Sequence, residues 1–459
     1  MGAPADPVAD ALGAALDGSV RNLRRLSGGA SRITSAFDLE AVDGTSRPLI
    51  LQQDRGDGMV PGGRVPIEMA LLVAAKDAGV PVPEVVAAGA ADGLDPGWLV
   101  VERLEGETIP RKLLRDPEWA LARSRLTAQC GSALAAIHGI DPGTISGLPR
   151  RDPLRHPLPF LDGLGAVRPC LELGVRWLAT NQPPSGRRVT VHGDFRMGNL
   201  LVGPDGLHAV LDWELAHAGD PAEDLGWLCA RSWRFGGPGR VGGFGELTEL
   251  LDSYAAAGGE AIDADRVRWW EAYAAVKWAV ICALQSATHL GGSIRSVELA
   301  AIGRRVCESE WDLLVLLGLA TGATDDADAT AGEATPDPDP APVVEPFGRP
   351  TAAELVESVR EHLDATVERS DSGRAQFDAR IARNVLRMVE RELQLGPSIA
   401  RSHAGRLAAL GFAGDAELAS AIRSGALDGD LAAVGRALAA STHDQLSVAN
   451  PSYLIDLGG

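Results

Sequence analysis

Hydrophobic and polar positions follow two different periods along the first 320 residues. Between residues 37 and 53 they alternate with a period of two on either side of an Asp-Gly pair, which predicts a β-hairpin. The same alternation predicts further hairpins over residues 85–103 and 200–211. Apolar residues recur instead at helical spacing over residues 67–78, 117–140 and 246–319. Strands therefore come first and helices dominate later, so this part of the chain predicts an α+β fold.

Residues 321–346 interrupt this pattern. They contain almost no large apolar side chains, seven acidic residues and no basic residue, so they cannot bury enough surface to offset the entropy lost on ordering. We interpret them as an acidic linker rich in Pro and Ala. After it, Thr351 and Glu354 have the spacing of a capping box, and helices are predicted over residues 372–395, 414–424 and 431–440. Residues 347–459 therefore predict a separate all-α helical domain.

Composition limits the classes of partner. The chain carries 43 basic and 62 acidic residues, a formal charge of −19, which argues against binding to nucleic acid or to an anionic membrane. The five cysteines are scattered, so we interpret them as buried thiols rather than a disulfide framework or a zinc site. The most apolar stretch, residues 272–284, is interrupted by Lys277 and is too short to span a membrane. With no basic and apolar leader at the N-terminus, the sequence predicts a soluble, cytoplasmic protein.

The clearest chemical pattern lies in a single loop and the hairpin after it. Asp194 is followed five residues later by Asn199, which is the spacing of a kinase catalytic loop, and Asp212 ends the next hairpin. Phosphoryl transfer needs a carboxylate to accept the proton of the attacking hydroxyl, oxygen ligands for Mg²⁺ and a cation near the transferred group. We expect the hairpin to bring Asn199 and Asp212 to one metal ion. We infer that Arg196 reaches the γ-phosphate, and we interpret His192 as a backbone anchor rather than a base.

The fuller pattern, residues 192–202 followed by residues 211–225, resembles the Brenner motif of the aminoglycoside/choline phosphotransferase family. Within that family it is similar to the branch of kinase domains related to acyl-CoA dehydrogenase fusions. The resemblance covers roughly residues 20–320. It implies a bilobal, protein-kinase-like fold with an N-lobe of residues 1–104 and a C-lobe of residues 105–320.

The resemblance also implies roles for individual residues. Asp194 would be the catalytic base, and Asn199 and Asp212 would be the Mg²⁺ ligands. Asp220 and Asp224 would be structural acids that brace the loop. A solvated surface position is an equally good interpretation of Asp224.

In the N-lobe, the phosphate-covering loop of the family corresponds to Ser27, Gly28 and Gly29. Adjacent glycines let backbone amides approach a phosphate, although an ordinary turn fits these residues almost as well. The strand that follows should supply a cation for the α- and β-phosphates, with Glu68 as the partner of that cation. The aligned residue is Gln52, where the family has Lys or Arg.

Gln52 is the main departure from the family pattern. An amide can donate a hydrogen bond to phosphate but supplies no charge, so Arg47 or Arg55 would have to compensate. The segment that joins the two lobes would bind the adenine edge through its backbone, near Val101 and Arg103.

Two further features have alternative interpretations. The aromatic residues between positions 269 and 278 are more readily interpreted as core than as part of an acceptor pocket, and Lys277 either extends to solvent or meets an anionic acceptor. His403 and His443 are isolated, and we expect both at the surface.

Taken with the resemblance, these residues predict an ATP- and Mg²⁺-dependent phosphotransferase that acts on a hydroxyl of a small molecule. A hydroxylated acyl compound is favoured over an aminoglycoside. The alternative is a non-catalytic pseudokinase scaffold, which Gln52 favours and the intact set of Asp194, Asn199 and Asp212 opposes. Residues 347–459 resemble an uncharacterised helical domain family, and we expect them to bind a protein partner or to self-associate.

Overall fold

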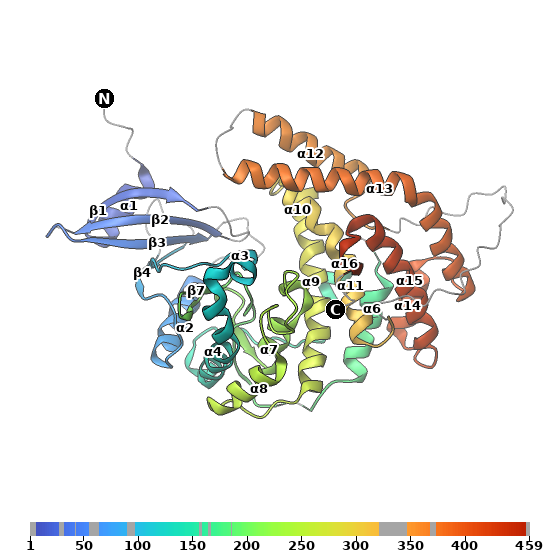
Figure 1. The fold of residues 1–459 in the computed structure, drawn as a ribbon, viewed down its shortest axis with the longest axis horizontal. Helices are drawn as coiled ribbons and strands as arrows, with labels where there is room; N and C mark the ends of the chain where they lie inside the picture. Colours follow the sequence, from blue (N-terminus) through green and yellow to red (C-terminus); the bar gives the residue numbers. More distant parts are fainter. Residues whose placement is uncertain are drawn as a thin grey trace. The chain divides into compact units, whose positions relative to one another are not determined.

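The fold is given by a computed structural model (Figure 1). It describes residues 6–26, 32–41, 43–54, 64–89, 97–155, 158–163, 167–184, 186–320, 347–367 and 373–455. Ser27, Gly28, Gly29 and the predicted linker of residues 321–346 lie outside this part of the chain. The chain divides into two compact units: the first contains residues 1–151 and 184–267, and the second contains residues 152–183 and 268–459.

A five-stranded antiparallel sheet opens the first unit (blue in Figure 1). Its strands are β1 (Gly18–Arg25), β2 (Arg32–Ala41), β3 (Ser46–Asp54), β4 (Val85–Gly89) and β5 (Trp98–Glu102). They lie in the order β1-β2-β3-β5-β4, with β2 antiparallel to β3 and β4 antiparallel to β5. The hairpins predicted over residues 37–53 and 85–103 are therefore confirmed.

One face of this sheet is apolar and is covered by helix α1 (Pro7–Leu16). Because side chains alternate between the faces of a strand, the residues of β3 and β5 that contribute to this core are two apart in the sequence. The buried members are Leu12, Phe37, Leu49, Leu51, Trp98 and Val100. Neither α1 nor β1 was predicted from the periodicity.

The opposite face of the sheet is polar at the end where β2 begins and β3 ends. The register pairs Arg32 with Asp54, and Gln52 lies two residues before Asp54 on the same strand. Cross-strand partners share a face, and so do residues two apart. Arg32, Gln52 and Asp54 therefore all point away from the core formed with α1.

Helices and two small sheets complete the first unit. Its helices are α2 (Val65–Asp77), α3 (Pro110–Arg115), α4 (Ala120–Gly139), α7 (Ala222–Cys229) and α8 (Leu247–Ala256), with 3-10 turns at η1 (Pro117–Trp119), η2 (Pro142–Thr144) and η3 (Arg231–Trp233). The small sheets pair β6 (Val189–Val191) with β9 (His217–Gly219) and β7 (Leu200–Gly203) with β8 (Gly206–Val210). The β7–β8 pair confirms the hairpin predicted over residues 200–211.

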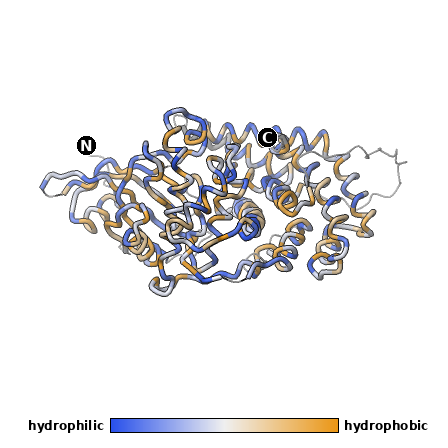
Figure 2. Tube along the Cα trace, turned by 60° about the horizontal axis from the view of Figure 1, so that its bottom comes forward, coloured by the Kyte–Doolittle hydropathy of each residue, from blue (hydrophilic) through white to orange (hydrophobic). Residues whose placement is uncertain are grey.

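The second unit contains helices and no strand among its described residues. Its elements are α5 (Leu158–Gly163), α6 (Pro169–Thr180), α9 (Ala264–Leu290, which starts at the end of the first unit), α10 (Val297–Ile302), η4 (Gly303–Arg305), α11 (Val306–Leu316), α12 (Ala352–Val367), α13 (Gly373–Ala409), α14 (Asp415–Ser424), α15 (Leu431–Ala449) and α16 (Ser452–Ile455). Figure 2 shows hydrophobic and hydrophilic residues alternating along the helices, as expected for helices with one buried side. The all-α character predicted after the linker is confirmed for the described residues.

Two local predictions after the linker can be compared with the structure. Thr351 N–H donates to the Glu354 carboxylate at 2.6 Å, and Glu354 N–H donates to Thr351 Oγ1 at 3.3 Å, which confirms the capping box. Helix α13 is longer than predicted because it continues through Pro397. A proline removes the hydrogen bond to the carbonyl four residues earlier. That carbonyl belongs to Leu393, which is 72% exposed, so water can replace the lost donor.

The helices after residue 347 share a core with helices that precede the linker. Helix α14 packs against α6, α15 against α11, and both α12 and α13 against α10. The core formed by α10, α12 and α13 consists of Val297, Ala300, Leu355, Val359, Ala382, Val385 and Val389. Within the second unit, residues 347–455 are therefore packed on α6, α10 and α11.

An ion-pair cluster joins α14 to α6. Arg423 donates to Asp162 at 2.7 Å and forms a two-pronged contact with Glu172, whose Oε2 is 2.8 Å from Arg423 Nε. We expect Arg423→Gln to lower the free energy of unfolding by about 1–2 kcal/mol, because Glu172 is 6% exposed and loses its charged partner. Arg401→Gln, at an exposed position of α13, is the control. Equal melting temperatures for the two variants would contradict this role.

Several sequence interpretations concern buried residues of the second unit. Trp269, Trp270 and Tyr273 are each 3% exposed and pack against one another, which supports their interpretation as core. Lys277, on the same helix, is also buried. The expectation that His403 lies at the surface is wrong, because it is 4% exposed and contacts Ser441 at 2.9 Å. A polar partner on α15 made that burial favourable.

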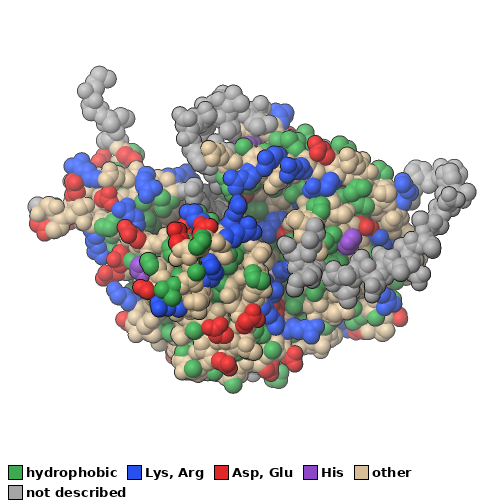
Figure 3. Space-filling view, in the orientation of Figure 1, with side chains coloured by type: hydrophobic (Ala, Val, Ile, Leu, Met, Phe, Trp, Pro, Cys, Tyr) green, Lys and Arg blue, Asp and Glu red, His purple; other side chains and the backbone are tan. Residues whose placement is uncertain are grey.

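The cysteines agree with their interpretation as buried thiols, and the surface carries charges of both signs. All five cysteines are buried and free. Figure 3 shows acidic and basic side chains near one another on the face that it presents. Among the helices of the described residues, none is both long enough and apolar enough to cross a bilayer.

Candidate functional site

Two short hairpins position the loop of residues 192–199. Strand β6 leads into the loop and pairs with β9, whereas β7 leaves the loop and pairs with β8. The Leu211 N–H donates to the Asn199 carbonyl at 2.8 Å, so the β7–β8 ladder continues beyond the strand ends. Asn199 and Asp212 are therefore neighbours at the open end of this hairpin, which is the adjacency expected from the sequence.

Asp194 is held at both carboxylate oxygens and is only 8% exposed. Its Oδ1 accepts hydrogen bonds from Arg196 Nε at 3.0 Å and from Trp227 Nε1 at 2.9 Å. Its Oδ2 accepts one from Asn199 Nδ2 at 2.6 Å. Such bonds to a charged acceptor restrict its orientation. Trp227, on α7, was missed in the sequence because nothing in its spacing from Asp194 indicates this contact.

His192 uses both ring nitrogens to hold the backbone. Its Nδ1 accepts the Asp194 N–H at 3.2 Å, and its Nε2 donates to the Leu211 carbonyl at 3.1 Å. Burial lowers the pKa of His192, which favours the neutral ring that this pair of bonds requires. The geometry supports the interpretation of His192 as an anchor.

Arg196 folds back onto the loop. Besides its bond to Asp194, it donates from Nη1 to the Met197 carbonyl at 3.1 Å, and its Cζ lies 4.4 Å from the centroid of the Trp233 ring. A guanidinium over an indole face is a favourable cation–π arrangement. These contacts orient Arg196 toward Asp194, and its contact with a γ-phosphate stays a prediction.

Asp212 combines an unusual backbone conformation with a crowded carboxylate. Its φ of 62° lies in the left-handed region, which is uncommon for a residue with a side chain. Burial, and then the nearby carboxylates of Glu214 and Asp194, raise the pKa of Asp212 to about 7. A divalent cation relieves such crowding of carboxylates.

Asn199 and Asp212 carry oxygen atoms of the kind that Mg²⁺ prefers as ligands. Within the described residues, no group of three His, Cys, Asp or Glu side chains is arranged to hold a metal ion. Mg²⁺ commonly takes only one or two protein oxygens and completes its shell with phosphates and waters. The Asp212 carboxylate and the Asn199 amide oxygen suit that arrangement, because the Asn199 side chain donates to Asp194 through Nδ2, which leaves its amide oxygen directed elsewhere.

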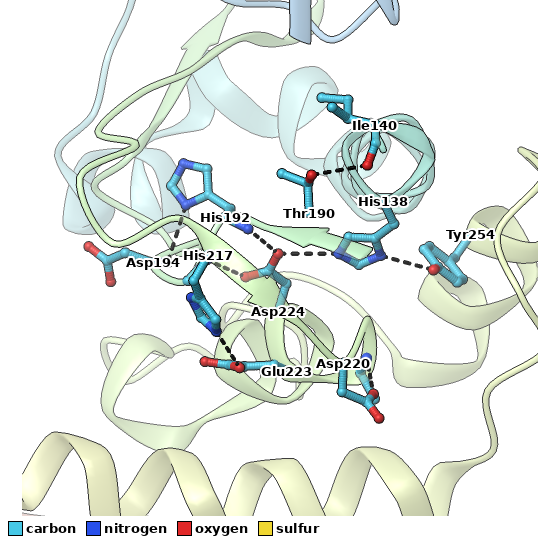
Figure 4. A network of polar contacts seen from close by, with 12 residues as sticks. His138, Ile140, Thr190, His192, Asp194, His217, Asp220, Glu223, Asp224 and Tyr254 are labelled. Carbon is cyan, nitrogen blue, oxygen red and sulfur yellow. Dashed lines mark hydrogen bonds and ion pairs between the residues drawn. The ribbon is translucent and has the colours of Figure 1, made fainter. Parts of the chain in front are cut away.

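Asp224 anchors the loop to α7 (Figure 4). It is fully buried and accepts the backbone N–H groups of His192 and Gly193, both at 2.8 Å. His138 Nε2 lies 3.2 Å from the same carboxylate, and its Nδ1 lies 2.9 Å from the Tyr254 hydroxyl. Burial acts to raise the pKa of Asp224, but His138 and then His192 lower it below its ordinary value. The structure therefore excludes the solvated surface position and supports the bracing interpretation.

Asp220 holds the segment that leads into α7. Its Oδ1 accepts the Ala222 N–H at 2.9 Å, and both of its oxygens lie 2.8 Å from Arg266 Nη2. Because α7 carries both Trp227 and Asp224, fixing the start of this helix also fixes two contacts of the loop.

Gly193 is required by the backbone of the loop. Its φ is 79°, and a Cβ there would lie 2.5 Å from the Leu215 carbonyl oxygen. We expect Gly193→Ala to lower the free energy of unfolding by about 2–4 kcal/mol in urea denaturation, because strain and a backbone clash add. Gly258→Ala is the matched control, since its φ is 97° and a Cβ there meets nothing within 4 Å. Equal losses in the two variants would contradict the effect of the Leu215 contact.

The cation opposite Glu68 comes from β2 rather than β3. Arg32 donates from Nη1 to the Glu68 carboxylate and from Nε to Asp54 Oδ1 at 3.0 Å. Arg32 is 7% exposed and Glu68 is 3% exposed. Burial raises the pKa of Glu68, and Arg32 acts to lower it. Gln52, the residue aligned with the family cation, is half-buried on the same strand as Asp54. Sequence reasoning missed the role of Arg32, although its place directly after the glycine-rich segment was a signal.

Of the two arginines considered as substitutes for a cation at position 52, the structure describes Arg47. Arg47 is nearly half exposed, lies toward the opposite end of β3 and pairs with Glu84 at 3.5 Å. Arg55 lies outside the described residues.

The segment expected to bind adenine is partly engaged in the sheet. Val101 is 6% exposed within β5. The Arg103 N–H donates to the Pro48 carbonyl at 3.1 Å, and the Arg103 guanidinium donates to Asp38 at 2.8 Å. The Arg103 amide is therefore unavailable to an adenine ring in this structure.

Two known protein families match different parts of the chain. The model of the Phosphotransferase enzyme family matches residues 22–270, and that of a Domain of unknown function (DUF6285) matches residues 369–453. The chain is 43% identical over 63 residues to mouse (Mus musculus) acyl-CoA dehydrogenase family member 10, a match that covers 13% of this chain and 6% of that protein. It is 32% identical over 175 residues to viomycin phosphotransferase from Streptomyces vinaceus, which covers 36% of this chain and 60% of that protein. The chain therefore spans less than two thirds of each of these curated relatives.

A solved structure shows the same fold. A Ralstonia eutropha protein described as an aminoglycoside phosphotransferase superposes with a TM-score of 0.53 at 20% identity, over 67% of this chain and 98% of that one. This similarity confirms the predicted kinase-like α+β fold. Because the family model spans more than half of the 459 residues, the chain belongs to the phosphotransferase enzyme family.

Proposed function

We propose that this chain transfers the γ-phosphoryl group of ATP to a hydroxyl group of a small molecule, with Mg²⁺ as cofactor. The observation that carries the proposal is the Asp194 carboxylate, which three donors hold beside Asn199 and Asp212. A buried carboxylate of fixed orientation, next to a pair of oxygen ligands, is the arrangement that phosphoryl transfer requires.

Asp194 acts as the proton acceptor through Oδ2. Toward the described residues, Oδ1 accepts two hydrogen bonds and Oδ2 accepts one from a side chain, which leaves a lone pair of Oδ2 for the hydroxyl of the acceptor. The hydroxyl oxygen forms a bond to the γ-phosphorus, its proton passes to Oδ2, and the bond to the β,γ-bridging oxygen breaks to release ADP. Arg196 and Trp227 keep the carboxylate in the orientation that accepts this proton.

Asn199 and Asp212 would hold Mg²⁺, which when bound neutralises part of the phosphate charge. Both residues lie at the open end of the β7–β8 hairpin, and ligands carried on one hairpin lose less entropy when they bind a common ion. Ser27, Gly28 and Gly29 remain proposed as phosphate-binding backbone, and Val101 as part of the adenine site.

A hydroxylated acyl compound is the proposed acceptor class. Support comes from the resemblance to kinase domains related to acyl-CoA dehydrogenase fusions, and from the short match to a protein named for that dehydrogenase family. A panel of hydroxylated acyl compounds and aminoglycosides, assayed for ATP consumption, tests the class. Consumption with aminoglycosides alone would overturn it.

Thermal shift tests nucleotide use before any acceptor is known. We expect ATP with Mg²⁺ to raise the melting temperature and Mg²⁺ alone to have a smaller effect. If ATP with Mg²⁺ gives no shift, the scaffold alternative replaces the proposal. In that case co-purification with and without residues 347–459 would test whether the C-terminal helices bind a protein partner.

A further inference from the structure

We infer that Arg32, at the start of β2, supplies the phosphate-binding cation that β3 lacks. This inference rests on the proposed function, because it assigns a residue to the same nucleotide site. Within the family pattern the cation belongs at position 52, and this chain has an amide there. The structure has a buried guanidinium on the same face of the sheet, carried by a different strand.

The contacts of Arg32 hold its guanidinium in one orientation. Its Nε donates to Asp54 Oδ1 at 3.0 Å, and its Nη1 donates to Glu68. Both partners are nearly as buried as Arg32 itself, since their side chains are 9% and 3% exposed. By the resemblance, Glu68 on α2 would be the partner of the cation at position 52. In this structure Glu68 is already paired with Arg32.

The strand register brings Arg32 to the side of the sheet that Gln52 faces. Arg32 is opposite Asp54 and Thr34 is opposite Gln52, so all four side chains share one face. Arg32 and Gln52 are thus separated by two positions of the ladder, or about 7 Å along the strands. An arginine side chain spans such a distance. A guanidinium from β2 can therefore bind the phosphates that a cation at position 52 would otherwise contact.

Arg32 retains donors for a phosphate. A guanidinium has five N–H groups in a planar fork. Toward the described residues Arg32 uses two of them, one for Asp54 and one for Glu68. Three N–H groups remain, enough for a two-pronged contact with phosphate oxygens.

Binding of ADP with Mg²⁺, measured by calorimetry alongside binding of adenosine, tests the assignment. We expect Arg32→Gln to weaken ADP binding by about 10- to 100-fold, the range for one charged hydrogen-bonding partner, and to leave adenosine binding within about twofold. Adding Gln52→Arg to Arg32→Gln returns a cation to the same face and should restore most of the ADP affinity. Arg47→Gln, on the exposed end of β3, is the control and should bind ADP like the wild type.

Folding must be separated from binding, because Arg32→Gln leaves Glu68 buried without a charged partner. The double variant Arg32→Gln with Glu68→Gln removes both charges, which costs less than removing one, and it should show the same selective loss of ADP affinity. Unchanged ADP binding in a folded variant, or an equal loss for ADP and adenosine, would overturn the assignment. So would a failure of both variants to fold, since that would make the pair purely structural. A wild type that does not bind ADP with Mg²⁺ would overturn the proposed function itself.

Discussion

Asp194→Asn is expected to lower the rate of phosphoryl transfer by about 1,000-fold while leaving ADP affinity unchanged. The amide cannot accept the proton of the attacking hydroxyl, and loss of a general base typically costs about 100- to 10,000-fold. ADP affinity should survive because ADP has no γ-phosphate and because Asp194 contacts Arg196, Asn199 and Trp227 rather than the residues assigned to the α- and β-phosphates. Steady-state ATP consumption and ADP calorimetry on the same preparation measure the two effects.

Asp205→Asn is the matched control for this prediction. Asp205 lies in the turn of the β7–β8 hairpin, and its side chain is 91% exposed, so the same chemical change there should leave both rate and stability near those of the wild type. A rate for Asp194→Asn within about tenfold of the control would remove Asp194 from the role of base. Melting curves of both variants show whether a lost rate reflects a lost fold.

Asp224→Asn is expected to lower the free energy of unfolding by about 3–5 kcal/mol, the range for breaking a buried charged pair. The Asp224 carboxylate accepts hydrogen bonds from two backbone N–H groups and lies against His138. An asparagine has one acceptor oxygen, so its NH₂ group would face another donor. The backbone of His192 and Gly193 would then lose its anchor, and the rate of transfer should fall together with stability. Asp252→Asn, at an exposed position on α8, should change stability by no more than about 0.5 kcal/mol.

The same carboxylate should make stability depend on pH in the acid range. Its pKa is lowered in the folded chain, so its contribution is fully present above the pKa of an unfolded aspartate, about 3.9. That contribution is lost as the pH falls through the lower folded value. In urea denaturation between about pH 5 and pH 3, the free energy of unfolding should therefore fall less steeply with decreasing pH for Asp224→Asn than for the wild type. Equally steep losses in the two proteins would contradict the lowered pKa of Asp224.

The parts of the site that are local in the chain could be predicted from the sequence, and the contacts that depend on packing could not. The loop of residues 192–199 could be recognised because its residues are contiguous and its spacing is set by local backbone geometry. The adjacency of Asn199 and Asp212 followed from one short hairpin, whose register is limited by its turn. Trp227 could not be found in this way, since its contact with Asp194 depends on how α7 packs beneath the loop.

The sequence alone was sufficient for the α+β fold, the three hairpins, the all-α character after the linker and the catalytic-loop spacing, because periodicity and short motifs are local properties. Only the tertiary structure decided which charges meet. Arg32 and Glu68 are 36 residues apart in the chain, and Asp224 reaches the backbone of His192 across 32 residues. Contacts over such separations depend on strand register and on the packing of helices, which no spacing encodes. For this reason the cation that pairs with Glu68, which was expected on β3, is Arg32 on β2.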